Sequence, residues 1–520
     1  MEENKISKGK EILAILLLTM VIATGTFAWI VWSSKDNTKM NVTIGDLADV
    51  SFKTGNDINI SNLSPSFYYD DGALTEFSIR KKKGLTTELN TNIYLDITSI
   101  SDELKNDNFK YVLLSSSDGN TYNEVISSSF KDASVGKLSI VTDTPLTDGK
   151  TYYKFYIWID SNNENNETMQ GKSLNGTLNV DVFTPPVNAV TLVEGLDKGD
   201  TGDSGSGVYK VEHSAIPASS SATGSEIPAV TDYRYYGASP NNYICLDMEG
   251  QSTCPDKHLY RIIGSIYEEL ENTNRIKVIK ATPLTDGTTK GFSWDYKVNN
   301  SRGSYDNIWA TITSGNYSNS LTSGSQLMKL LNSGAWWNGT SGSYYNNSTT
   351  ATTVNFTNYK LSDKAKSYIT TSRYYLGGYN ASSGVMTNQF YTYERGTTRY
   401  NTNRPLYWDG YVGLMYPSDY GYAAGNSCVT GTDPFKYAGG CKNKDWLWMT
   451  TSSDYTNGVE WLMSPDSGNS YTVFRVLSAG YVDGYNRSNS NFSARPTFFL
   501  TSSVSITSGK GTSVAPYILS

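Results

Sequence analysis

Short runs of alternating or β-branched residues recur between about residues 41 and 183, and polar turns separate them. The turns include Asp70-Asp71-Gly72 and Asp148-Gly149. Strands at this spacing are typical of an antiparallel β-sandwich, with room for one helix at most. We therefore expect a β-sandwich domain over residues 36–184. The runs are NVTIGD, NTNIYLDITSI, KYVLLSS, KLSIVTD, TYYKFYIWID and GTLNVDVF.

The second half of the chain contains segments with the apolar spacing of strands and others with the apolar spacing of helices. Two apolar runs, 259–266 and 275–281, predict paired strands, and a later run at 471–477 predicts another strand. Residues 324–331 and 361–369 have the spacing of short helices. Long Gly- and Asn-rich stretches separate them. These features predict an α+β domain over residues 232–520.

Between the two domains, residues 185–231 lose this periodicity and are rich in Gly, Ser and Pro. Such a composition predicts a flexible linker. Gly199, Gly202 and Gly205 fall at every third position, as in collagen, but three triplets without Pro are too few for a triple helix. We interpret them as linker, with a remnant of a collagen-like stalk as the alternative.

The N-terminus contains 21 uncharged residues, 12–32, enough for a helix to span a bilayer core of about 30 Å. Residues 1–35 are therefore a transmembrane anchor or a cleaved signal peptide, and the sequence does not separate the two. Lys5, Lys8 and Lys10 favour a cytoplasmic N-terminus. Either way, the rest of the chain is expected to be extracytoplasmic, at the cell surface or secreted.

Composition narrows the classes of function. A chain of 520 residues predicts two or three domains, and a formal net charge of −7 gives no general attraction to nucleic acid. The only two histidines are His213 and His258, which leaves little basis for histidine-dependent catalysis. The pattern Gly-x-Ser-x-Gly of serine hydrolases does not occur. We expect no cofactor.

Four cysteines lie in the second half of the chain: Cys245, Cys254, Cys428 and Cys441. In an exported protein, an even number suggests disulfides, and we favour the sequential pairing because it closes short loops. A zinc site of all four thiolates is the rival interpretation, although neither pair has the spacing of a zinc knuckle.

The carboxylate side chains leave open the possibility that the chain is a hydrolase. A glycosidase needs two carboxylates that face each other across the glycosidic bond, but separation along the sequence does not show which pairs do so. The candidates are Asp409, Asp419, Glu394, Glu460 and Asp466.

Oxygen-bearing side chains also alternate at Asp160, Asn162, Glu164 and Asn166, as in a calcium loop. The Gly and the final Glu of an EF-hand are missing, so we favour a solvated hairpin tip and expect no metal.

Aromatic residues are concentrated beyond residue 230, where 30 of the 39 Tyr and eight of the 11 Trp lie. Tyr is favoured at binding surfaces because it offers contact area with few torsions to fix. For each single ring, however, packing in the core is the stronger expectation. The Trp residues are Trp294, Trp309, Trp336, Trp337, Trp408, Trp446, Trp448 and Trp461.

Two segments in the first half resemble camelysins and secreted biofilm-matrix fibre proteins of Gram-positive bacteria. The run Gly25-Thr26-Phe27-Ala28 is similar to the end of their signal peptides, and residues 152–160 with 170–174 resemble the last strands of their sandwich. This resemblance implies the same sandwich fold and a tendency to assemble; it does not by itself carry over the fibre function.

The second half resembles an uncharacterised module in surface proteins of gut Firmicutes, related to the formylglycine-generating-enzyme and C-type-lectin type. This resemblance implies a C-type-lectin-like α+β fold. The calcium and sugar triplets of lectins and the C-terminal cysteines of the formylglycine-generating enzymes do not occur. The matching residues are 233–235, 240–243, 261–264, 413–420, 461–465, 494–496 and 509–512.

Together these observations predict a cell-surface ligand-binding or adhesion protein with a distal recognition domain. Its partner would be a glycan, a surface protein or a matrix component. The alternatives are a structural subunit that assembles through the sandwich, and an extracytoplasmic hydrolase.

Overall fold

A computed structural model of the protein is mainly β and divides into two compact units, residues 1–185 and 186–520. The structure describes residues 40–44, 47–85, 88–161, 166–295, 312–313, 316–317, 325–348, 350–380, 384–400, 402, 404–448, 458–468, 472–487 and 490–520. The apolar segment 12–32 and two residues of the expected hairpin tip, Asn162 and Glu164, lie outside these ranges. In the described part of the chain, no helix is long and apolar enough to cross a membrane.

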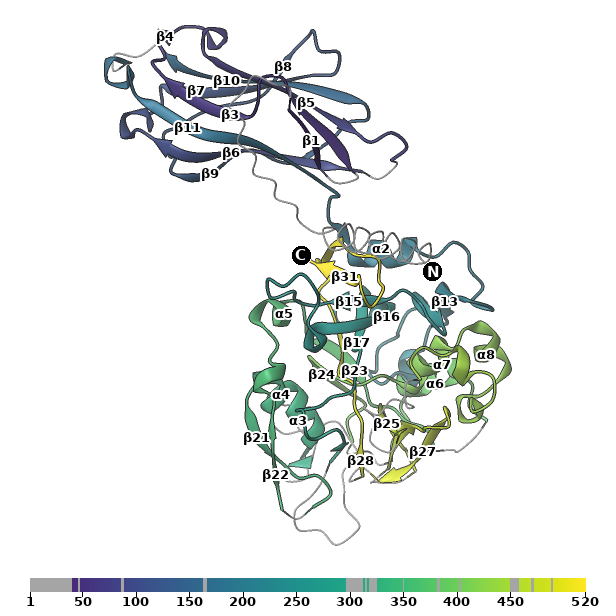
Figure 1. The fold of residues 1–520 in the computed structure, drawn as a ribbon. Helices are drawn as coiled ribbons and strands as arrows, with labels where there is room; N and C mark the ends of the chain where they lie inside the picture. The colour runs from purple at the N-terminus through teal and green to yellow at the C-terminus, as the bar shows by residue number, and fades with distance from the viewer. Residues whose placement is uncertain are drawn as a thin grey trace, which may run out of the picture. The chain divides into compact units, whose positions relative to one another are not determined.

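The first unit is a β-sandwich of two sheets (Figure 1). One sheet has the order β1-β2-β5-β10-β7-β8, with β4 parallel to β10, and the other has the order β3-β11-β6-β9. The strands are β1 (Met40–Ile44), β2 (Ala48–Phe52), β3 (Asp57–Ser61), β4 (Pro65–Ser66), β5 (Ala73–Lys81), β6 (Asn90–Ile100), β7 (Phe109–Ser116), β8 (Asn123–Ser129), β9 (Gly136–Pro145), β10 (Lys150–Asp160) and β11 (Ser173–Phe183).

Alternating side chains explain why these segments pair as a sandwich. Along β11 every second residue is buried, from Leu174 to Val182. A strand places alternate side chains on opposite faces, so one face of β11 enters the core that the two sheets share. The six predicted strands are confirmed, whereas β2, β3, β4, β5 and β8 were not predicted.

Residues 186–231 are folded, and the prediction of a flexible linker is wrong. They contain β12 (Val187–Asn188), helix α2 (Ala189–Gly195) and strand β13 (Ser206–His213), all within the second unit. The Asn188 side chain caps α2 by accepting hydrogen bonds from Val190 N and Thr191 N.

The three glycines that suggested collagen are turn residues. Gly199, Gly202 and Gly205 have φ angles of 78°, 74° and 80°. Glycine adopts this left-handed region without a steric penalty, which explains its repetition between α2 and β13.

The second unit is built on a nine-stranded sheet with the order β12-β30-β31-β15-β16-β14-β13, extended from β16 by β17 and β29. The predicted strands at 259–266 and 275–281 are confirmed as the antiparallel pair β16–β17. Its further strands are β14 (Val230–Gly237), β15 (Tyr243–Cys245), β16 (Leu259–Glu268), β17 (Thr273–Lys280), β29 (Thr497–Phe499), β30 (Ser505–Ser508) and β31 (Tyr517–Leu519).

Short helices and small sheets cover this framework (Figure 1). The predicted helices correspond to α3 and α5, and the late strand to β26. The helices are α3 (Gln326–Asn332), α4 (Ala335–Asn338), α5 (Asp363–Ser367), α6 (Thr387–Glu394), α7 (Pro417–Ala423) and α8 (Asn426–Gly431). The small sheets contain β18 (Phe292–Ser293), β19 (Ile312–Thr313), β20 (Asn316–Tyr317), β21 (Ser341–Tyr344), β22 (Thr352–Asn355), β23 (Ser372–Tyr375), β24 (Tyr407–Gly410), β25 (Glu460–Pro465), β26 (Thr472–Val476), β27 (Val482–Arg487) and β28 (Asn491–Phe492).

Many of the aromatic residues form the core of this unit, as expected for single rings. Trp294, Trp336, Trp408 and Trp461 are fully buried. Trp294 and Trp461 contact each other edge to face with ring centroids 6.2 Å apart. Trp309 lies outside the described residues.

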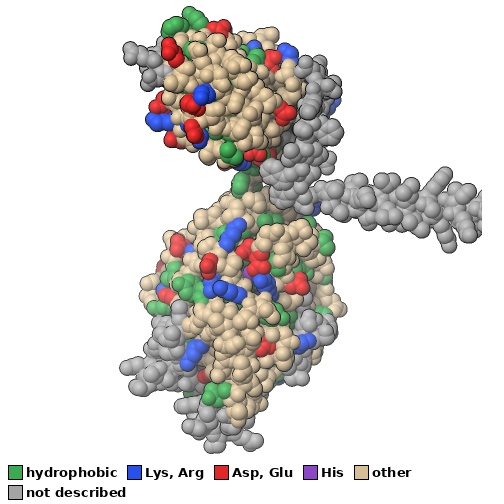
Figure 2. Space-filling model, turned by 60° about the vertical axis from the view of Figure 1, so that its left-hand side comes forward, with side chains coloured by type: hydrophobic (Ala, Val, Ile, Leu, Met, Phe, Trp, Pro, Cys, Tyr) green, Lys and Arg blue, Asp and Glu red, His purple; other side chains and the backbone are tan. Residues whose placement is uncertain are grey.

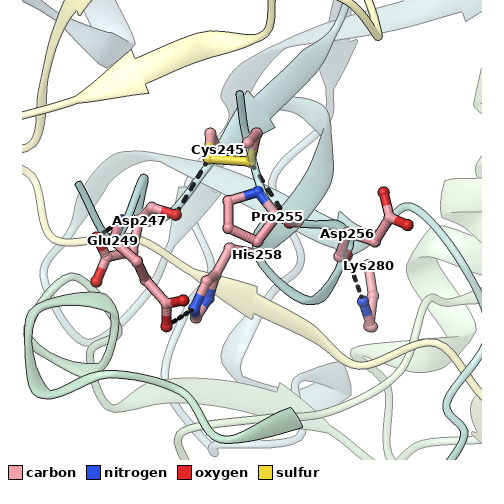
Figure 3. The surroundings of a disulfide bond; sticks show 8 residues. Cys245, Asp247, Glu249, Pro255, Asp256, His258 and Lys280 are labelled. Carbon is pink, nitrogen blue, oxygen red and sulfur yellow. Dashed lines mark hydrogen bonds and ion pairs between the residues drawn. A yellow bond between two sulfur atoms is a disulfide. The ribbon is translucent and has the colours of Figure 1, made fainter. Parts of the chain in front are cut away.

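Both sequential disulfides are present, Cys245–Cys254 and Cys428–Cys441. Figure 3 shows the first, which closes the loop between β15 and β16 near His258 and Glu249. Disulfides persist in oxidising compartments, so the two bonds indicate an extracellular environment.

Candidate functional site

A groove of about 440 Å³ lies on the second unit beside strand β13. One wall is formed by four successive residues of β13, Tyr209 to Glu212. The opposite wall comes from the α6 to α8 region, which lies beside β13 in Figure 1. Its residues are Met386, Asn388, Tyr422, Asn426, Val429 and Thr430.

Buried aromatic rings form the floor of this groove. Tyr209, Val211, Tyr422 and Val429 belong to one hydrophobic cluster, and the Tyr209 hydroxyl donates a hydrogen bond to the Tyr422 carbonyl at 3.0 Å. This hydrogen bond joins β13 to α7, the two sides of the groove. The rim is polar, with exposed Lys210 and Glu212 paired at 2.7 Å.

Behind the groove lies a buried network of charged groups. Arg234 on β14 donates to Asp232 Oδ2 at 2.8 Å and to Asp419 Oδ1 at 3.0 Å. Lys277 on β17 donates to Asp419 Oδ2 at 2.6 Å. These four side chains are 0–2% exposed, so each charge is stabilised by the others instead of by water.

Asp419 occupies the first turn of α7, which explains why it reaches this network. Pro417 starts the helix, and Asp419 Oδ2 also accepts a hydrogen bond from Tyr416 N at 2.9 Å. Burial alone would raise the pKa of Asp419, but Lys277 and Arg234 outweigh it and hold that pKa below its usual value. The carboxylate therefore stays charged and fixes α7 against the sheet.

His213 connects β13 itself to the network. Its Nε2 lies 3.0 Å from Asp232 Oδ2, and its ring stacks on Tyr391 of α6 with centroids 3.6 Å apart. Burial lowers the pKa of His213, although Asp232 acts in the opposite direction. His213 therefore holds β13 in place and has no nucleophile among the partners described here.

Glu394 at the end of α6 joins the same region. Its two carboxyl oxygens accept hydrogen bonds from Ser418 N at 2.9 Å and Ser418 Oγ at 2.5 Å. Burial raises the pKa of Glu394 to about 7, with Arg395 acting in the opposite direction. A carboxyl with this pKa suits proton transfer, but Glu394 is 1% exposed and does not line the groove.

The structure does not bring the five candidate carboxylates together at one site. It brings only Glu394 and Asp419 to one region, on either side of Ser418. Glu460 forms a buried bidentate pair with Arg495 at 2.7 and 2.9 Å. Asp409 is paired with Arg373, and Asp466 accepts a hydrogen bond from Gly468 N. None of the five lines the groove, so no facing pair for hydrolysis is formed there.

The calcium loop, which the sequence offered as the less favoured interpretation of residues 160–166, gains no support from the residues described. Asp160 is 6% exposed, and its carboxylate forms an ion pair with Lys110 at 2.5 Å. Within the described ranges, no three His, Cys, Asp or Glu side chains are placed to hold a metal ion.

The residues that carry the resemblance to surface-protein modules are mainly structural. Arg234, Asp419 and Arg495 are buried in ion pairs, and Trp461 Nε1 donates to the Phe292 carbonyl at 2.8 Å. The groove residues of β13 were missed because they fall in the segment interpreted as linker. The alternation in SGVYKVEH was the signal that would have identified a strand.

Two other surface features differ from the groove beside β13. A second groove of about 370 Å³ lies between α3, α4 and β21, lined mostly by small or polar residues such as Ser333, Gly334 and Ser341. On the first unit, Phe67 and Tyr68 are 68% and 69% exposed. Figure 2 shows acidic and basic side chains interspersed on the visible face, without a large patch of one sign.

These observations define a mainly β protein of two units, with disulfides and a surface groove on the second unit. The chain matches no protein-family model, and a search of curated proteins finds no match.

Proposed function

We propose that this chain is a cell-surface recognition protein, in which the second unit binds its ligand in the groove beside β13. The observation that carries this proposal is the groove itself. Its floor is aromatic, its rim is polar, and both walls are fixed by buried hydrogen bonds and ion pairs. A preformed site of this kind loses little conformational entropy when a ligand binds.

The cell-surface location that we propose for the protein is supported by three features. The apolar segment 12–32 is suited to anchor or export the chain, both disulfides need an oxidising compartment, and the acidic charge gives no affinity for nucleic acid. We further propose that the second unit is of the formylglycine-generating-enzyme and C-type-lectin type. Its framework of one central sheet with short helices and long loops supports this assignment.

Binding of the whole chain to arrays of glycans and surface proteins tests the proposal. The Thr430→Trp variant places an indole in the groove from an exposed position, and we expect it to abolish specific binding. Thr142→Trp, at an exposed position of the sandwich, is the matched control and should bind normally. Binding that survives Thr430→Trp would place the recognition site elsewhere.

A second candidate function is assembly through the sandwich, favoured by the exposed aromatic rings of Phe67 and Tyr68. Large exposed apolar groups that adjoin one another are typical of interaction sites. If the chain assembles this way, Phe67→Ser with Tyr68→Ser should abolish concentration-dependent filaments in electron microscopy. Val135→Ser, which removes a single apolar residue that is 67% exposed, should leave them unchanged.

A further inference from the structure

Strand β13 is the terminal strand of the central sheet. It pairs with β14 over eight residues, from Ser206 opposite Gly237 to His213 opposite Val230. Within the described residues, β14 is its only partner strand. In a β-ladder, alternate residues direct their N–H and C=O groups to opposite sides. Half of the backbone groups of β13 therefore point away from β14, toward an open edge.

The groove follows this open edge. Successive side chains of a strand point to opposite faces of the sheet, so a pocket on one face would be lined by alternate residues. Here Tyr209, Lys210, Val211 and Glu212 line the groove in succession. This lining places the groove along the edge of β13, between the strand and the α6 to α8 region.

The two sides of this edge differ in chemistry. Tyr209 and Val211 lie on the buried side with Tyr422 and Val429, whereas Lys210 and Glu212 are exposed on the other side. An extended polypeptide also directs alternate side chains to opposite sides. A strand in the groove would place apolar side chains beside Val211 and Val429, and charged side chains beside Lys210 and Glu212.

The charges on the groove rim also favour an extended polypeptide as the ligand. Lys210 is neutralised by Glu212 at 2.7 Å, so the rim offers no net positive charge for a phosphate or another anion. A peptide with an acidic residue opposite Lys210 and a basic residue opposite Glu212 satisfies both charges. The unpaired backbone groups of β13 are complementary to another extended backbone, which supplies donors and acceptors at matching intervals.

We propose that the groove binds an extended segment of a partner protein, which adds to the edge of β13 as a further strand. This inference rests on the proposed function of the groove and names its ligand class. The His213–Asp232 contact and the Tyr209–Tyr422 hydrogen bond hold β13 in position, so the edge of the strand is preformed for binding.

The test starts with the whole chain and two probes: a display library of random linear peptides and a glycan array. We expect selected peptides with alternating apolar and charged residues. Methylation of single backbone nitrogens in such a peptide should then weaken binding at every second position, by about tenfold for each hydrogen bond removed, and have little effect at the positions between. This alternation is specific to strand addition.

Two variants of the protein complete the test. Exchanging the rim charges with Lys210→Glu and Glu212→Lys should reverse the charge preference of the selected peptides. The matched control exchanges the exposed pair Lys53 and Glu76, also 2.7 Å apart, on the first unit. It should leave peptide selection unchanged.

Each outcome separates this inference from the proposed function. Peptides that tolerate methylation at all positions, or a charge exchange without effect, would overturn strand addition while leaving a binding groove. Glycan binding that is lost in Thr430→Trp would support the groove and overturn a polypeptide ligand. If neither probe binds to the unmodified chain, this inference fails, and the array of surface proteins decides the proposed function separately.

Discussion

Lys277 and Asp419 are 142 residues apart in the sequence, yet the Lys277 ammonium donates to Asp419 Oδ2 at 2.6 Å in the interior of the second unit. Burial lowers the pKa of Lys277, and Asp419 acts in the opposite direction. The pair joins β17 to the first turn of α7 and so ties the α6 to α8 wall of the groove to the central sheet.

Removing one member of this pair should destabilise the fold. In Lys277→Met, Asp419 keeps Arg234 but loses a buried cation, and we expect the free energy of unfolding to fall by about 3 kcal/mol. Chemical denaturation measures this loss. Lys53→Met removes an exposed ion pair of similar length and should cost less than about 1 kcal/mol. Equal losses in the two variants would contradict the role assigned to the buried pair.

Glu394 predicts a specific pH dependence of stability. Its pKa is raised from 4.5 to about 7 by burial, so the folded protein binds this proton more tightly than the unfolded chain does. Stability from this group is therefore greatest below pH 4.5 and is lost as the pH rises toward 7. The full loss is up to about 3 kcal/mol, at 1.36 kcal/mol for each pKa unit.

Glu394→Gln removes this dependence while keeping an acceptor for Ser418. We expect the variant to gain stability relative to the unmodified protein as the pH is raised from 5 to 8, measured by urea unfolding. Other titrating groups, including His213, contribute to both proteins alike. Parallel curves for the two proteins across this range would show that Glu394 does not titrate as described.

The two disulfides should differ in their effect on binding. Cys428 lies in α8, which contributes Asn426, Val429 and Thr430 to the groove, whereas the Cys245–Cys254 bond closes a loop between β15 and β16. Replacing either pair with serine should cost about 2 to 4 kcal/mol of stability. Only the change at Cys428 and Cys441 should also weaken ligand binding, measured on folded protein. Equal binding losses would contradict this assignment.

Gly202 and Gly199 offer a matched pair of substitutions in the turns before β13. Both have positive φ, so alanine at either position should cost about 1 kcal/mol from backbone strain. A Cβ at Gly202 would also lie 2.7 Å from the Tyr209 ring, while one at Gly199 would meet nothing within 4 Å. Gly202→Ala should therefore lose about 1 to 3 kcal/mol more and displace Tyr209 from the groove floor. Thermal unfolding and ligand titration of both variants measure the difference.

The sequence predicted the sandwich strands with strong alternation, because one buried face imposes a period of two on residues such as those of β11. It also predicted the β16–β17 pair and both disulfides. It failed for β13, where Gly- and Ser-rich turns on either side hid an eight-residue strand. The groove was not predictable, since it depends on Tyr422 and Val429 meeting β13 from more than 200 residues away. The environments of the candidate carboxylates were not predictable for the same reason, because partners such as Lys277 and Arg495 are brought to them only by the fold.

The central sheet of the second unit also determines when this unit can fold. β12 pairs with β30, and β15 pairs with β31. The strands near residues 187 and 244 therefore cannot pair until the chain beyond residue 504 is available. Pairings this distant close large loops and form slowly. As the chain crosses the membrane in the proposed export, β15 emerges long before its partner. Folding of this unit is therefore completed only after nearly all of it has been translocated.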